Sequence, residues 1–302
     1  MKIALLSTNS SKIAAAMVRA RRAAGSPAMD MVMTLVVITD EDNVGEDLDS
    51  ATNLSREHPS RVIGMIYGSG RGSANLDAKV RVGEENSGES ILLRISGELT
   101  KHAESVVLPL LLPDSPVVVW WPRRAPANPS ADSIGSLGQR RITDAESAKS
   151  PVRALRAVIG NHAAGDTDLA WTRLTPMRAT LAAALDQVQS KVTKVEVETG
   201  AGNPAADLLI AWLSSRLKVS IVTKRGNYDH ISSVRMHTGA GTVSIERGAG
   251  DVATFSVPGS TERQIPLGPR SLTELLAEEL RRLDEDDVYS KTITHLLTRL
   301  DS

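Results

Sequence analysis

Apolar runs and stretches with helical spacing alternate along the first half of the chain. Residues 31–39 and 61–67 form short, continuous runs of β-branched and aliphatic residues, which are typical of strands buried on both faces of a sheet. Residues 76–82 and 92–96 alternate between apolar and polar side chains, which predicts strands with one covered face. A helix is predicted over residues 100–112, and a further strand over residues 116–121.

Helices and short strands also alternate in the second half. Ser150 followed by Pro151 is typical of a helix start, so a helix is predicted over residues 151–159. Longer helices are predicted over residues 169–185 and 203–217. Residues 230–258 contain three short strands separated by glycine-containing turns, which predicts an antiparallel meander.

These elements predict an α/β protein with two domains, each a mixed sheet flanked by helices, the second containing the meander. A chain of 302 residues exceeds the usual size of a single core. The predicted domains are residues 1–162 and 163–302, because a proline-, alanine- and serine-rich stretch and the helix over 151–159 precede the second set of elements.

Composition excludes several classes of function. The formal net charge of −1 provides no general attraction to nucleic acid or to an anionic membrane. The chain has no cysteine, which excludes disulfides, thiolate metal sites and a cysteine nucleophile. The first apolar run is too short for a secretory signal, and no later segment approaches the ~20 apolar residues of a membrane span. We therefore expect a cytoplasmic protein without nucleic-acid or membrane partners.

Three patterns that could indicate enzyme chemistry have simpler interpretations. Gly68-Ser-Gly-Arg-Gly-Ser73 follows a predicted strand like a dinucleotide-binding turn, but the third glycine is replaced and no helix follows, which favours a hairpin loop. None of the six histidines forms a zinc-binding pair at helical spacing. Asp166 and Asp168 could hold Mg²⁺, but at a predicted helix start capping is favoured for at least one of them. We expect no catalytic residues, no metal and no cofactor.

Tryptophan and arginine residues gather in two segments and leave two interpretations open. Trp120 and Trp121 must point to opposite faces of their strand, so we expect one in the core and the other near the surface or at a domain contact. Tryptophan and arginine dominate the energies of protein interfaces. The arginines near these tryptophans form either structural ion pairs or an anion-binding cluster, since their planar forks suit carboxylate and phosphate equally. The expected pairs are Arg140 and Arg141 with Asp144, and Asp168 with Arg173, while Arg123 adds positive charge nearby.

Three motifs together resemble a known family. They are Gly165–Arg178, Val117–Pro122 with its Trp-Trp-Pro end, and Gln139–Asp144. The resemblance is to the OpcA family of glucose-6-phosphate dehydrogenase assembly proteins, and it extends in order and spacing to segments such as Leu35–Asp40 and Ala206–Leu213. It implies a non-catalytic, allosteric partner that binds NADP-dependent glucose-6-phosphate dehydrogenase and promotes its active form at the start of the pentose phosphate pathway.

The residues that we expect to bind the partner or to support that surface belong to these motifs. They are Trp120, Trp121, Arg123, Arg140, Arg141, Asp144, Asp166, Asp168, Trp171 and Arg173. The alternative is a sensor or enzyme that binds a sugar phosphate or a nucleotide near Arg140, Arg141, Asp166 and Asp168.

Overall fold

The chain divides into two compact units. The computed structural model describes residues 1–25, 31–55, 57–83 and 89–300. Unit 1 comprises Met1–Asp144, Asn161–Thr167 and Leu272–Glu285, and unit 2 comprises Ala145–Gly160, Asp168–Ser271 and Asp286–Ser302. The predicted boundary between residues 162 and 163 concerns domains that fold independently, and it stays a prediction.

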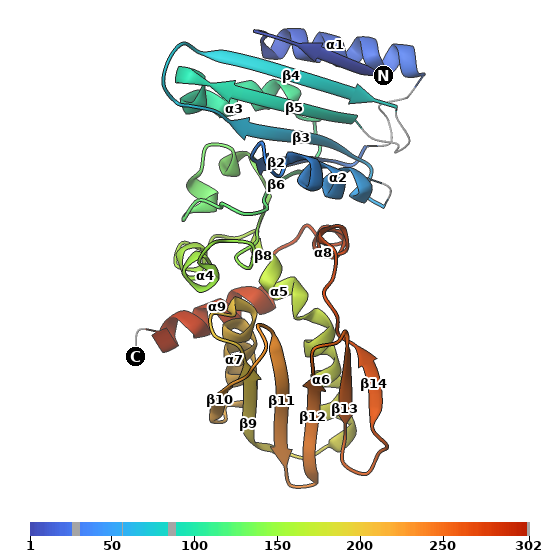
Figure 1. The fold of residues 1–302 in the computed structure, drawn as a ribbon, viewed down its shortest axis with the longest axis vertical. Helices are drawn as coiled ribbons and strands as arrows, with labels where there is room; N and C mark the ends of the chain where they lie inside the picture. Colours follow the sequence, from blue (N-terminus) through green and yellow to red (C-terminus); the bar gives the residue numbers. More distant parts are fainter. Residues whose placement is uncertain (26–30, 56, 84–88, 301–302) are drawn as a thin grey trace. The chain divides into compact units, whose positions relative to one another are not determined.

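Unit 1 contains an eight-stranded mixed sheet (Figure 1). Its strand order is β1-β4-β5-β3-β2-β6-β7-β8. The strands are β1 (Lys2–Leu5), β2 (Met33–Thr39), β3 (Ser60–Tyr67), β4 (Asn75–Val82), β5 (Glu89–Ser96), β6 (Val117–Trp121), β7 (Arg140–Thr143) and β8 (Asp166–Asp168). From β5 through β7 neighbouring strands are parallel, whereas β4 is antiparallel to both β1 and β5.

Helices cover both faces of this sheet. On one face, α1 (Ser10–Ala24) and α3 (Ala103–Val107) pack with Ile63 and Met65 in one buried cluster. A side chain at the neighbouring Gly64 would face the opposite side of the sheet, where Leu48 of α2 (Val44–Leu54) occupies the space. The helix α8 (Leu272–Leu280) contacts α2 on that second face. The β2 and β3 side chains are buried on both faces as a result, as their apolar runs predict.

Two local expectations for unit 1 are wrong. The segment expected as one helix over residues 100–112 is broken into α3 and flanking 3-10 helices. Pro109 lacks the N–H that a continuing α-helix needs, so α3 ends at Val107. The glycine-rich segment Gly68–Ser73 is not a hairpin loop. It joins β3 to β4, and these strands are separated by β5 in the sheet. As expected, this segment does not begin a helix.

Unit 2 contains a six-stranded sheet in the order β10-β9-β11-β12-β13-β14. Its strands are β9 (Val192–Thr199), β10 (Ile221–Arg225), β11 (Ile231–Thr238), β12 (Gly241–Arg247), β13 (Val252–Ser256) and β14 (Arg263–Pro266). The strands β9 and β10 are parallel, and the remaining pairs are antiparallel. The expected meander is therefore confirmed, with β14 as an additional strand.

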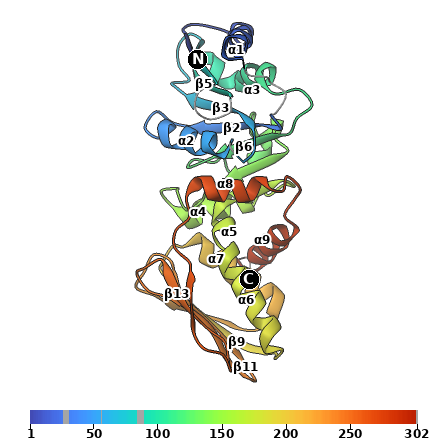
Figure 2. The ribbon, with the colours of Figure 1, turned by 90° about the vertical axis from the view of Figure 1, so that its right-hand side faces the viewer.

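The helices of unit 2 are α4 (Pro151–Ile159), α5 (Leu169–Arg173), α6 (Thr175–Val188), α7 (Pro204–Leu217) and α9 (Asp287–Leu300). Figure 2 shows α6, α7 and α9 on the same side of the sheet. The helix expected over residues 169–185 is divided into α5 and α6, because Pro176 lies in the first turn of a new helix. Ser150 precedes α4 but makes no side-chain cap hydrogen bond. Within the described ranges of the chain, no helix is long and apolar enough to cross a membrane.

Candidate functional site

The strands β6 and β7 place the expected site residues on two opposite faces of the unit 1 sheet. They are parallel, with Val118 opposite Arg140 and Val119 opposite Arg141. Side chains alternate along each strand, so Trp120 shares a face with Arg140 while Trp121 shares the other face with Arg141. Both indoles are buried, at 0% and 2% exposure. Neither indole lies near the surface, because β6 is an inner strand of a sheet covered on both faces, and a domain contact by one of them stays a prediction.

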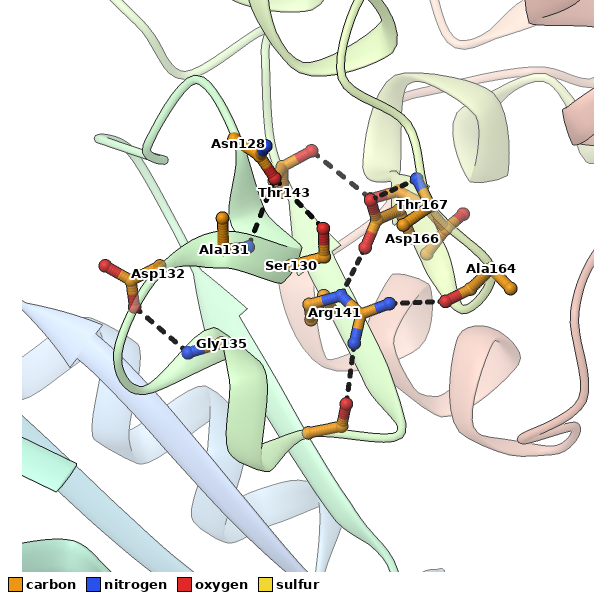
Figure 3. Close-up of polar contacts among 12 residues, drawn as sticks. Asn128, Ser130, Ala131, Asp132, Gly135, Arg141, Thr143, Ala164, Asp166 and Thr167 are labelled. Atoms are coloured by element: carbon orange, nitrogen blue, oxygen red, sulfur yellow. Dashed lines mark hydrogen bonds and ion pairs between the residues drawn. The ribbon is translucent and has the colours of Figure 1, made fainter.

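Arg141 connects three segments of unit 1 (Figure 3). It is 7% exposed, and its Nε donates to a carboxylate oxygen of Asp166. One terminal nitrogen donates to the carbonyl of Gly138 over 2.6 Å, and the other to the carbonyl of Ala164. Asp166 also accepts from the backbone N–H of Ala163 over 2.8 Å. The guanidinium therefore fixes the turn before β8 against the segment that leads into β7.

Arg140 makes a second buried ion pair on the opposite face. Its Nη2 lies 2.7 Å from a carboxylate oxygen of Glu279 in α8, and both side chains are almost fully buried. Its Nη1 donates to the carbonyl of Asp284 over 3.1 Å. These contacts attach a segment far along the chain to the unit 1 sheet, because Glu279 follows Arg140 by 139 residues.

The segment between β6 and β7, residues 122–139, has a fixed backbone, and we call it the β6–β7 loop (Figure 3). It contains two 3-10 turns, Pro129–Ala131 and Gly135–Leu137. Asn128 Oδ1 accepts from the N–H of Ala131 over 3.1 Å, and Asp132 Oδ1 accepts from the N–H of Gly135 over 3.0 Å. Any Cβ at Gly135 would overlap the carbonyl of Pro129 and lie 3.0 Å from the Trp121 ring. These contacts hold the loop in one defined backbone conformation.

Arg123, at the start of this loop, joins it to the beginning of α2. Its guanidinium lies 2.5 Å from an oxygen of Asp47 and 3.0 Å from one of Glu46. Burial raises the pKa of the fully buried Asp47 carboxyl, and hydrogen bonds from Thr39 and Arg123 oppose that rise. Because the guanidinium faces this carboxylate, Arg123 has a structural partner within unit 1.

In unit 2 the expected residues surround α5. Asp168 accepts from the N–H of Ala170 over 2.9 Å, which confirms that it caps the following helix. Trp171 is 1% exposed, and its Nε1 donates to Asp286 over 2.8 Å. The guanidinium of Arg178 lies 3.5 Å from the centre of the Trp171 ring, a cation–π contact. Arg173 lies 3.1 Å from Glu146.

Burial is the common property of these site residues. Eight of the ten are buried, including Asp144 at the end of β7, and only Arg123 and Arg173 keep about a quarter of their side chains exposed, at 24% each. Their main contacts hold elements together. Within the described part of the chain, no three histidine, aspartate or glutamate side chains gather to hold a metal ion.

Two family models match consecutive parts of the chain. Both describe the glucose-6-phosphate dehydrogenase subunit: the model of its N-terminal domain matches residues 51–159, and the model of its C-terminal domain matches residues 164–293. The chain belongs to the OpcA family of glucose-6-phosphate dehydrogenase assembly proteins. The resemblance inferred from the three motifs is thereby confirmed. All ten expected site residues lie within the two matched ranges.

Other comparisons are more distant. No curated protein matches the chain. Solved structures of similar shape include an oxidoreductase domain protein from Kribbella flavida, with 8% identity, a TM-score of 0.48, and coverage of 88% of this chain and 94% of that one. A dehydrogenase from Clostridium difficile has 6% identity, a TM-score of 0.45, and coverage of 89% and 97% respectively. Neither likeness carries a functional argument.

Sequence reasoning missed the residues that order the β6–β7 loop. Asn128, Asp132 and Gly135 are typical turn residues, and Asn128 directly precedes Pro129. That spacing is a signal for consecutive tight turns. The decisive contact, between Arg141 and the carbonyl of Gly138, depends on the pairing of β6 with β7 and has no signal in the local sequence.

Proposed function

We propose that this protein binds glucose-6-phosphate dehydrogenase and raises its activity by favouring the active form, without chemistry of its own. The match of both family models, over residues 51–159 and 164–293, carries the proposal. A protein that binds the active arrangement of an enzyme more tightly than the inactive one shifts that equilibrium by the difference in affinity. The proposed setting is the cytoplasm, where the dehydrogenase forms NADPH in the pentose phosphate pathway.

The β6–β7 loop is the surface of unit 1 that we propose to contact the dehydrogenase. Loops of this length are uncommon in compact domains and usually have a function. Arg141 and the loop's own capped turns hold its backbone in one conformation, so binding costs little conformational entropy. Arg124, Asn128 and Gln139 on this loop are exposed. Trp121 and Arg141 support it, which gives these buried residues a role in binding without contact to the partner.

The charge at the centre of the unit 1 sheet favours a non-catalytic role over a dehydrogenase role. The strand β2 lies between β3 and β6, so the order of strands reverses there, and open α/β sheets bind dinucleotides at such a point. In this chain Asp40, Glu41 and Asp42 follow β2, and Glu46 and Asp47 begin α2. A hydrogen bond from the Asn43 side chain lowers the pKa of Asp40 below its ordinary value. Glu41 is paired with Arg94, and Glu46 and Asp47 with Arg123, so Asp40 and Asp42 are the carboxylates that would repel a pyrophosphate here.

The geometry also disfavours the alternative site for a sugar phosphate or nucleotide at Arg140 and Arg141. Both guanidinium groups are buried and oriented toward Glu279 and Asp166, on opposite faces of the sheet. A phosphate could reach them only by displacing a buried carboxylate, which would then lose its partner.

The test of this proposal is an NADPH-forming assay of glucose-6-phosphate dehydrogenase with and without the purified chain, combined with co-purification. We expect a complex and an increased rate at micromolar concentrations. Absence of both would overturn the proposed function.

A charge reversal tests the proposed surface. Arg124→Glu should raise the concentration for half-maximal activation at least about tenfold, because reversing an interface charge costs several kcal/mol. The matched control is Arg81→Glu, which reverses another exposed charge of unit 1 on β4. Equal activation by both variants, with unchanged melting temperatures, would exclude the β6–β7 loop as the contact surface.

A further inference from the structure

Unit 2 contains a cavity that is separate from every residue proposed to contact the dehydrogenase through the β6–β7 loop. Its volume is about 740 Å³, which lies in the range of small-molecule sites. It lies where β9 ends and α7 begins, and the turn before β11 and the end of β12 also line it. Its lining includes Arg173, Arg247, Arg270, Gly202, Asn203 and His230.

Three arginines from three different segments line the cavity. Arg173 ends α5, Arg247 ends β12, and Arg270 precedes α8. Each is oriented by a contact within unit 2: Nε of Arg173 lies 3.1 Å from Glu146, Nε of Arg247 donates to Gly250 over 2.9 Å, and Nη1 of Arg270 donates to Thr172 over 3.3 Å.

Positive charge exceeds negative charge in this lining. Its carboxylates are Glu146, which pairs with Arg173, and Asp229, whose side chain is fully exposed. His230 adds a ring whose Nδ1 and Nε2 lie near Asp229 and the carbonyl of Gly248. The three arginines therefore outnumber the two carboxylates among the lining side chains, and Asp251, outside the lining, lies 3.8 Å from Nη2 of Arg247.

A glycine-containing turn forms another wall. The parallel strands β9 and β10 are joined through α7, and Gly200-Ala-Gly-Asn203 connects β9 to that helix. Gly202 has a φ of +74°, and a Cβ added there would meet no atom within 4 Å, so the backbone at this point is open to an approaching group. Asn203 caps α7 through Ala206 and donates to the carbonyl of Asp229 over 2.9 Å, which fixes two walls together. The start of α7 adds partial positive charge to that of the arginines.

The remaining wall is apolar and contains Leu174, Met177 and Leu267. A ligand that fills the cavity would therefore contact guanidinium groups in one part and apolar side chains in another. We propose that this cavity binds a small organic phosphate, with the phosphoryl group at the arginines and the Gly202 turn and the organic body against the apolar wall. Through such a site unit 2 would bind a metabolite whether or not the dehydrogenase is bound.

Isothermal titration calorimetry on the isolated full chain tests the proposal at constant ionic strength. The probes are glucose 6-phosphate, inorganic phosphate and uncharged glucose. We expect glucose 6-phosphate to bind at least about fivefold tighter than inorganic phosphate, because one buried methylene group already contributes ~0.8 kcal/mol. Glucose should not bind. Equal affinity for the two phosphates would overturn the assignment to an organic phosphate.

Variants locate the binding site. Arg247→Gln should weaken glucose 6-phosphate at least about tenfold, since a charge-assisted hydrogen bond contributes roughly 1.5–3 kcal/mol. The matched control is Arg235→Gln, which removes a charge of β11 that pairs with Glu246 outside the cavity. Should Arg247→Gln lower the melting temperature, Arg247→Lys replaces it, because it keeps the charge and loses only the fork.

Two further outcomes would overturn the proposal and leave the proposed function unaffected. One is unchanged affinity in the Arg247 variant. The other is that neither phosphate binds at about 10 mM. If Arg247→Gln then abolishes activation of the dehydrogenase, the cavity binds an acidic side chain of that partner. Since the calorimetry contains no dehydrogenase, failure to activate the enzyme leaves its result unaffected.

Discussion

Replacing Arg141 by methionine should destabilise unit 1 far more than replacing an exposed arginine. The substitution leaves the Asp166 carboxylate, 8% exposed, without its guanidinium, and it removes a donor from the carbonyls of Gly138 and Ala164. Removing one member of a buried ion pair costs about 3–5 kcal/mol, because the remaining charge stays buried. At about 2–4 °C per kcal/mol, the melting temperature should fall by roughly 10 °C.

The matched control is Arg94→Met in the same unit. Arg94 makes two contacts with Glu41, but the two side chains are 31% and 56% exposed. An exposed pair of this kind contributes about 0–1 kcal/mol, so the melting temperature should change by less than about 4 °C. The difference between the two variants isolates burial as the cause.

Circular dichroism measures the melting temperature, and amide hydrogen exchange reports on the loop. In Arg141→Met, peptides from residues 122–139 should exchange faster, because Arg141 holds the carbonyl of Gly138. Adding Asp166→Asn should restore part of the lost stability, since it removes the unpaired charge. If Arg141→Met and Arg94→Met unfolded within about 3 °C of each other, or if Asp166→Asn restored nothing, burial of the ion pair would not be the source of the lost stability.

Three further predictions concern other residues. Burial lowers the pKa of His162 below 6.5, so folding favours its neutral form. The stability from this neutral form is present above pH 6.5 and is lost as the pH falls through the lower pKa of the folded state. In a pH series of melting curves, His162→Gln should reduce that loss. Gly135→Ala should lower the melting temperature because its Cβ would overlap a carbonyl, whereas Gly45→Ala, with nothing within 4 Å in α2, should raise stability by about 0.5–1 kcal/mol. Trp171→Phe should destabilise unit 2 by roughly 1–3 kcal/mol in urea unfolding, because Asp286 loses its indole donor.

Each of these predictions has a clear opposite outcome. An unchanged pH dependence in His162→Gln would show that another group controls acid stability; His102→Gln, at an exposed position, is the control. A fully stable Gly135→Ala variant would contradict the tight approach of the two turns. For Trp171→Phe, the comparison is Trp212→Phe in α7, whose side chain is only half-buried; equal losses would show that the hydrogen bond to Asp286 adds nothing.

Much of the fold follows from local pattern. The apolar runs at residues 33–39 and 60–67 form parallel strands, since only a sheet covered on both faces can bury them. Helix starts were predictable where the cap is local, as for Asn203 with Pro204 and for Asp168. Interruptions were less predictable, because Pro109 and Pro176 compete with apolar spacing that would otherwise continue a helix.

The α/β class, the alternation that places Trp120 and Trp121 on opposite faces, and the family motifs can all be inferred from the order of residues. The burial of both indoles cannot, because coverage of the second face depends on α2 and α8, and α8 follows β6 by about 150 residues. The partners of the arginines also depend on the tertiary structure. Arg140 pairs with Glu279 and Arg141 with Asp166, since an ion pair depends on which elements meet in space and carries no periodicity along the chain.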